Sequence, residues 1–126
     1  MKSFTRLILT TFALLTLTLS SYWAQVSVTA TGGTTTGTYG TISDAFGAIN
    51  AGTHQGAITI TITADITEPL IPNVLGPSSG TASYTSVLIK PQGDRIVTQV
   101  PCTPLTSANY HKAIIMLGGA TNVTID

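Results

Sequence analysis

The sequence predicts a mainly β fold, the start of a solenoid of parallel strands with a short capping helix. The segment 57–66 alternates apolar and polar residues with the period of a strand. Shorter apolar runs follow at intervals of roughly 25 residues, which lies within the range typical of solenoids. Tight hairpin pairs such as Asn-Gly or Asp-Gly are absent. A β-sandwich is the alternative, because strands at ordinary spacing would also fit this pattern.

Residues 1–24 have the anatomy of a cleavable secretory signal peptide. Lys2 and Arg6 form a short positive region, and residues 7–19 form an apolar stretch. This stretch contains several threonines and is shorter than the roughly 20 apolar residues that a spanning helix needs. The sequence therefore favours cleavage over a permanent membrane anchor.

Cleavage is expected between Ala24 and Gln25, because a small residue precedes this bond and a strand-like pattern follows it; a cut after Ser21 is the alternative. A lipid anchor would need a cysteine at the cut, and the only cysteine, Cys102, lies far away. Cys102 is expected to be a buried free thiol, with an intermolecular bridge as the alternative. The chain is therefore expected to be exported, secreted or held at the cell surface, without a stable membrane span after cleavage.

The part of the chain after the leader is poor in charge. Its lysines and arginines are Lys90, Arg95 and Lys112. Without a basic cluster and with few aromatic residues, this part offers no electrostatic footprint for nucleic acid. Nucleic acid is therefore excluded as a partner.

Residues 25–40 are expected to form one strand and a loop. Val26–Ala30 alternates as a strand does, and residues 31–40 are rich in glycine and threonine. These glycines do not match a phosphate-binding loop, because the lysine that would contact the phosphates is missing.

Residues 41–52 predict a short amphipathic helix. Thr41 is suited to cap its first turn with Asp44 as the reciprocal partner, and Gly52 is suited to end it in the left-handed conformation. We expect residues 41–126 to hold this capping helix and the first coils. The apolar face of the helix, at helical spacing, consists of Ile42, Ala45, Phe46 and Ile49.

The segment 57–66 is the clearest strand in the chain. Its isoleucines and Ala64 fall on one face, expected to be buried, and its threonines and Asp65 on the other. The centres of this and later runs, near Ile62, Ile89 and Ile115, give the repeat of roughly 25 residues. The later apolar runs are 87–89, 96–97, 113–117 and 123–125.

Several short motifs occur through the part of the chain after the leader: Tyr39-Gly40-Thr41, Ala45-Phe46, residues 48–54, residues 56–60 and residues 122–126. Together they resemble the N-terminal portion of large secreted Bacteroidota-type surface proteins. The resemblance covers most of residues 25–126 and implies a right-handed parallel β-helix behind a signal peptide, with export through the type IX system by a C-terminal sorting domain. It also implies that the chain is a fragment of a longer protein, truncated after Asp126.

No residue pattern indicates a catalytic, cofactor-binding or metal-binding site. His54 and His111 are isolated and are expected to have structural or surface roles. Lys90 with Gly93-Asp94-Arg95 has residue types that β-helix lyases and hydrolases use on acidic sugars, but the spacing fits a solvated turn better. Asn122 begins a glycosylation-type triplet and is expected to lie in a turn instead.

The sequence favours a non-enzymatic, adhesin-like structural module whose partners are surface glycans or other cell-surface proteins. The alternative is the N-terminal part of a β-helix carbohydrate-active enzyme, a polysaccharide lyase or glycoside hydrolase, with catalytic coils beyond Asp126. In both cases the strand over 123–125 is expected to leave an open sheet edge that invites association with other chains.

Overall fold

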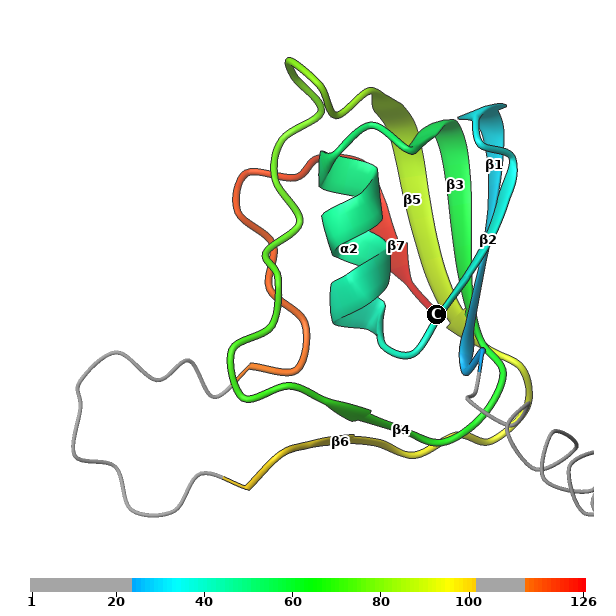
Figure 1. Ribbon diagram of the computed structural model, residues 1–126, viewed down its shortest axis with the longest axis vertical. Coiled ribbons are helices and arrows are strands. Elements are labelled where there is room, and N and C mark those ends of the chain that lie inside the picture. The colour runs from blue at the N-terminus through cyan, green and yellow to red at the C-terminus, as the bar shows by residue number, and fades with distance from the viewer. Residues whose placement is uncertain (1–23, 102–112) are drawn as a thin grey trace, which may run out of the picture.

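The computed structural model describes residues 24–101 and 113–126 (Figure 1). Residues 1–23 of the predicted leader, Cys102 and His111 lie outside the described residues. The described part is mainly β with one short helix, as the sequence predicts. Its elements are β1 (Val26–Gly33), β2 (Thr36–Tyr39), α2 (Ile42–Asn50), β3 (His54–Ile62), β4 (Ile66–Glu68), β5 (Tyr84–Pro91), β6 (Val97–Gln99) and β7 (Val123–Ile125).

The main sheet is mixed, with the strand order β2-β1-β3-β5-β7. β1 runs antiparallel to both β2 and β3, whereas β3, β5 and β7 are parallel. β4 and β6 form a second, parallel pair, and Leu75 makes a parallel bridge with Leu117. Figure 1 shows the main sheet on one side, the β4–β6 pair across the bottom and two loop segments opposite the sheet. Successive passes of the chain therefore pair in parallel at three places.

The repeat that these passes form differs from the predicted one. The parallel ladder aligns Ile60 with Ile89 and Ile89 with Ile125. Ile115 is therefore not the third equivalent position, and residues 113–117 form no strand of the sheet beyond the bridge at Leu117. The segments that connect the aligned strands β3, β5 and β7 differ in length. A fixed period therefore could not locate the third strand.

The predicted strand over 57–66 is divided into two, so the prediction of one continuous strand is wrong. β3 ends at Ile62, and the next residue, Thr63, still donates its N–H to the Gln25 carbonyl at 2.8 Å, which continues the register of β1 and β3 by one residue pair. The chain then bends and enters β4 at Ile66. The predicted buried face is nevertheless correct for Ile58, Ile60, Ile62 and Ile66, while Ala64 at the bend is only half-buried.

The Gly/Thr-rich segment 31–40 is a hairpin, and its prediction as a loop is wrong. β1 continues to Gly33, and β2 returns beside it with Thr29 opposite Thr36. Gly33 adopts a φ of 67°, and a Cβ there would lie 2.6 Å from the Thr53 carbonyl oxygen. Glycine is required at this position, since both the conformation and the close approach exclude a side chain.

Helix α2 is capped by Thr41 and followed by Gly52, as the sequence predicts, but no bond from the Asp44 carboxylate back to Thr41 accompanies the cap. The Thr41 hydroxyl accepts the Asp44 N–H at 3.0 Å, and Gly52 has a φ of 76° just beyond the helix. The predicted apolar face is buried, and it packs on β1, β2 and β3. The helix therefore covers the interior at the β1–β3 end of the sheet.

The loop 69–83 covers the other side of α2 and holds the helix at both ends (Figure 1). At the N-terminal end, Asn73 donates its backbone N–H to the Ser43 hydroxyl and its side-chain amide to the Ser43 carbonyl, both at 2.8 Å. At the C-terminal end, the Asn50 amide donates to the Val74 carbonyl at 2.8 Å and accepts from the Gly76 N–H at 3.0 Å. α2 is thus enclosed between the sheet and this loop.

Candidate interaction surface

His54 is a buried structural residue, in agreement with the sequence analysis. Its Nδ1 bonds to the Thr34 carbonyl, which can only accept, so Nδ1 carries the hydrogen. The Nε2 atom of a neutral imidazole is then an acceptor, and the Tyr39 hydroxyl donates to it at 2.6 Å. Burial raises the pKa of the Tyr39 hydroxyl. The Tyr39 ring meets the imidazole edge-on, with the ring centres 5.8 Å apart. His54 therefore fastens the hairpin to β3.

The charged triplet near Lys90 lies in an exposed turn between β5 and β6, as predicted. Gly93 has a φ of 73°, and the Arg95 guanidinium contacts the Asp94 carbonyl at 3.3 Å. Residues 90–96 are all exposed. This segment therefore has no convergent, buried arrangement of acid and base groups.

Asn122 lies in a turn, as predicted for the glycosylation-type triplet. Its φ is 57°, a left-handed conformation that asparagine tolerates better than most residues. Its side-chain amide donates to the Thr85 carbonyl at 3.1 Å, and its carbonyl accepts the Val87 N–H at 3.0 Å. Asn122 therefore directs the chain into β7.

Glu68 is the one buried acid among the described residues, and the sequence analysis missed it. Its two carboxylate oxygens accept the N–H groups of Ile42 at 2.7 Å and Ser43 at 3.0 Å, the first residues of α2. Burial raises the pKa of this carboxyl; the two N–H groups act in the opposite direction, and Asp44 raises the pKa further. One feature of the sequence indicates its burial. Glu68 follows Ile66 by two residues, which places both side chains on the same face of a strand.

Among residues 24–101 and 113–126, no group of three or more His, Cys, Asp or Glu side chains is placed to hold a metal ion. In the same two stretches, no helix has the length and apolar character needed to cross a membrane.

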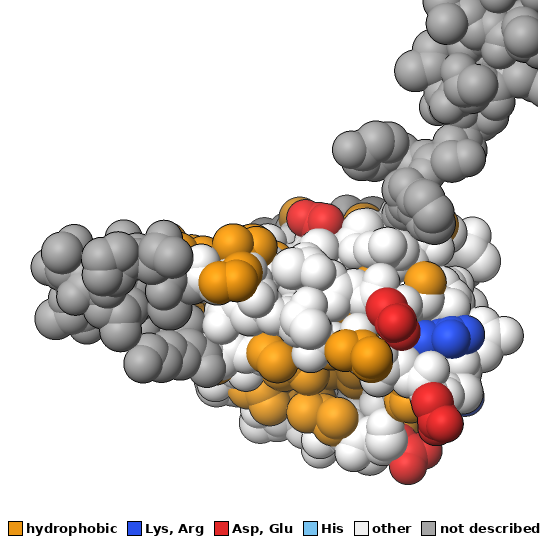
Figure 2. Space-filling model, turned by 90° about the horizontal axis from the view of Figure 1, so that it is seen from below, with side chains coloured by type: hydrophobic (Ala, Val, Ile, Leu, Met, Phe, Trp, Pro, Cys, Tyr) orange, Lys and Arg blue, Asp and Glu red, His pale blue; other side chains and the backbone are white. Residues whose placement is uncertain are grey.

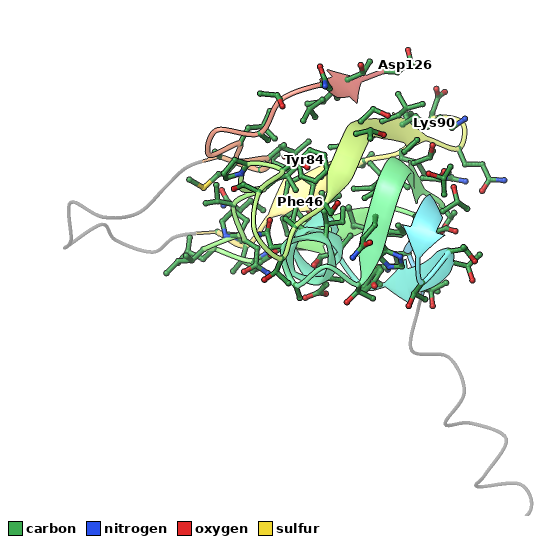
Figure 3. All side chains as sticks on the ribbon, turned by 90° about the horizontal axis from the view of Figure 1, so that it is seen from above. Phe46, Tyr84, Lys90 and Asp126 are labelled. Carbon is green, nitrogen blue, oxygen red and sulfur yellow. The ribbon has the colours of Figure 1, made fainter. Side chains whose placement is uncertain are left out.

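An apolar hollow of about 200 Å³ lies beside the end of β7. Ile42 of α2, Ile62 of β3, Ile89 of β5 and Ile125 of β7 contribute to its walls, together with Val97 and residues 114–115. Lys90, Arg95 and Asp126 also line it. Figure 3 shows Lys90 and Asp126 at the ends of the neighbouring strands β5 and β7.

β7 forms one edge of the main sheet, since among the described strands it pairs only with β5. Val123 is half-buried and packs against the core, whereas Ile125 is 57% exposed. We call β7 together with the hollow the open edge. It combines backbone groups that no described strand pairs with exposed apolar side chains, and both features are typical of surfaces that contact other chains.

A second set of exposed apolar residues lies near the β4–β6 pair. Ile71 follows β4, while Ile96 and Val100 flank β6, and their exposure ranges from 44% to 66%. Figure 2, seen from below, shows apolar side chains on this face, with most of the charged side chains at the right. β4 and β6 each pair only with the other among the described strands, so this sheet also has unpaired strand edges.

Comparisons of the chain with protein-family models, with curated proteins and with solved structures give no match.

Proposed function

We propose that the chain is a non-enzymatic structural module of a secreted or cell-surface protein, built as the helix-capped start of a right-handed parallel β-helix. The observation that carries the proposal is the parallel pairing of successive passes at three places: β3–β5–β7, β4–β6 and Leu75–Leu117. Each coil of a solenoid contacts only the coils before and after it. In a parallel β-helix, the strands on each side of one coil therefore pair in parallel with the equivalent strands of the next coil.

The position of α2 supports this proposal. Its contacts lie on β1, β2 and β3, whereas β7 lies at the far edge of the sheet. A solenoid exposes an apolar interior at each end, and a terminal cap with a polar outer face is needed to cover it. In this proposal α2 is the cap of one end, and β7 lies at the other.

The outer face of the main sheet supports a role as a surface module. Thr59 pairs with Thr29 on one side and with Leu88 on the other, and Thr124 continues the row. The neighbouring row, which includes Thr38, Ser27 and Thr61, is also hydroxylated. Together with the signal-peptide pattern and the resemblance to Bacteroidota-type surface proteins, this face favours an adhesin-like module, exported as type IX cargo, whose partners are surface glycans or other surface proteins.

Export is the part of the proposal that is tested most simply. Expressed in a Gram-negative host, the chain is expected to leave the cytoplasm and to begin near Gln25, as measured by N-terminal sequencing and intact mass. A Leu14→Arg/Leu15→Arg variant is the matched control. It places two charges in the apolar stretch and is expected to keep Met1 and remain in the cytoplasm. Retention of Met1 in an exported wild-type product would overturn the leader and its cleavage.

A further inference from the structure

We propose that position 25 is a modification site, at which Gln25 cyclises to pyroglutamate after the leader is removed. Pyroglutamate is a cyclic amide that replaces the charged α-amine at the start of a chain. Glutamine stands directly after the expected cut. The proposal rests on the proposed function in one respect, namely that the leader is cut between Ala24 and Gln25. It goes beyond export, because it assigns a covalent change to the product of that cut.

Gln25 is held in the fold by its own backbone. Its carbonyl accepts the Thr63 N–H at 2.8 Å and the Thr63 hydroxyl at 3.0 Å, and its N–H donates to the Tyr39 carbonyl at 3.0 Å. Ala24 is exposed, and its carbonyl accepts a longer bond of 3.3 Å from the same Thr63 hydroxyl. Loss of Ala24 removes only this longer bond, so the carbonyl of residue 25 stays anchored after the cut.

The side chain of Gln25 is placed so that it can react. Val26 and Val28 are fully buried, and alternation along the strand directs the Gln25 side chain to the opposite, outer face. The hydrogen bonds that tie Gln25 to the described residues are made by its backbone atoms. The side-chain amide carbon, Cδ, can therefore approach the nitrogen of the same residue.

The reaction balances within residue 25 and needs no co-reactant. The neutral α-amino nitrogen attacks Cδ, and a bond forms between these two atoms. The bond between Cδ and Nε2 breaks, and Nε2 leaves as ammonia with one hydrogen taken from the amine. An α-amino group releases its proton closer to neutral pH than a lysine does, so part of the chains carries the reactive neutral amine. Because both groups belong to one residue, the attack is intramolecular and has a high effective concentration.

The surroundings of residue 25 favour the neutral product. Burial of a charge costs free energy, and position 25 is half-buried. An α-ammonium carries three hydrogens, whereas the partner that the described residues supply to this nitrogen is the Tyr39 carbonyl. The nitrogen of the cyclic amide carries one hydrogen and no charge. Cyclisation therefore removes a charge and two donors from the position just before β1.

Mass spectrometry of the exported, purified chain tests the proposal. During incubation at neutral pH, the product that begins at Gln25 is expected to become lighter by one ammonia. Stepwise N-terminal sequencing is expected to read the fresh product from Gln25 and to be blocked in the incubated one. Treatment of the unfolded, incubated chain with pyroglutamate aminopeptidase is then expected to restore a sequence that begins at Val26. A product that keeps its full mass and its free amine throughout prolonged incubation would overturn the proposal.

Gln25→Asn is the matched control. It keeps a side-chain amide at position 25 but lacks one methylene, so ring closure would require a strained four-membered ring in place of a five-membered one. We expect this variant to keep its full mass and to remain open to N-terminal sequencing. Equal loss of ammonia from both proteins would place the reaction at another amide and contradict the assignment to Gln25.

The outcomes separate this proposal from the proposed function. A full-mass product that begins at Gln25 overturns the cyclisation and leaves the leader, its cleavage and export untouched. A product that begins at Tyr22, from the alternative cut after Ser21, also overturns the cyclisation, since tyrosine has no side-chain amide, and is still an exported product. Retention of Met1 in an exported product overturns the leader and the cyclisation together.

Discussion

Two buried polar residues join elements that lie far apart in the sequence. Glu68 joins β4 to the first turn of α2, and His54 joins β3 to the β1–β2 hairpin. A carboxylate at the N-terminus of a helix accepts free N–H groups and is stabilised by the helix dipole. The sequence patterns pointed only to Asp44, within the helix, as the reciprocal partner of the Thr41 cap. The acid that binds the N–H groups of Ile42 and Ser43 comes from a later strand, which local patterns do not reveal.

Glu68→Gln is expected to destabilise the fold by about 1–3 kcal/mol, because an amide has one acceptor oxygen where the carboxyl group has two. The amide nitrogen would face a backbone N–H of α2 and leave it unsatisfied in a buried site. Urea denaturation monitored by circular dichroism measures the change in the free energy of unfolding. Asp94→Asn removes an exposed carboxylate and is expected to change that energy by less than about 0.5 kcal/mol. Equal midpoints for the two variants would show that Glu68 does not hold α2.

The difference between wild type and Glu68→Gln is also expected to depend on pH. Because burial raises the pKa of Glu68 in the folded state, the bound proton contributes stability that is full below the ordinary pKa of a glutamate. This contribution is lost as the pH rises through the raised value. The free-energy difference between the two proteins is therefore expected to be larger in acid than at neutral pH. A free-energy difference that grows from acid to neutral pH would mean that the hydrogen bonds from Ile42 and Ser43 affect the pKa of Glu68 more than burial does.

At the scale of elements, the helix was more predictable than the strands. Thr41, Gly52 and the apolar face of α2 act within a few residues, so their effects are visible in the sequence. The hairpin at Gly33 depends on the close approach of Thr53, which is distant in the chain, whereas the bend between Ile62 and Ile66 interrupts an apolar and polar alternation that continues through it in the sequence. A strand at residues 123–125 was predicted correctly, but the hollow beside it is lined by residues of five elements and could not be derived from periodicity.

The loop 69–83 is expected to stabilise α2 mainly through Asn50, whose side chain binds both Val74 and Gly76. Asn50→Ala removes both bonds and is expected to lower the free energy of unfolding by about 1–2 kcal/mol, since the better helix propensity of alanine offsets part of the loss. Thr53→Ala, at an exposed position just beyond the helix, is the control, with an expected change below about 0.5 kcal/mol. The same effect from both variants in chemical denaturation would exclude this role for Asn50.

At the scale of the whole molecule, one parallel ladder determines the architecture. β3, β5 and β7 place their inward residues in line, α2 encloses one end of the interior, and the hollow beside β7 lies at the other edge. A β-sandwich would instead pack two separate sheets face to face. The ladder also accounts for the exposure of Ile125. No described strand lies beside β7 on the side away from β5, so nothing among the described residues covers this side chain there.

The order of the outward residues Thr59, Leu88 and Thr124 across β3, β5 and β7 tests this architecture most directly. Paired cysteines in a Cys102→Ser background, oxidised in dilute solution, report which positions are neighbours. The pairs Thr59→Cys/Leu88→Cys and Leu88→Cys/Thr124→Cys are expected to form intramolecular disulfides, because adjacent strands lie about 4.8 Å apart. Thr59→Cys/Thr124→Cys, separated by a whole strand, is expected to form none. A disulfide in this third pair without one in the first two would contradict the parallel stack.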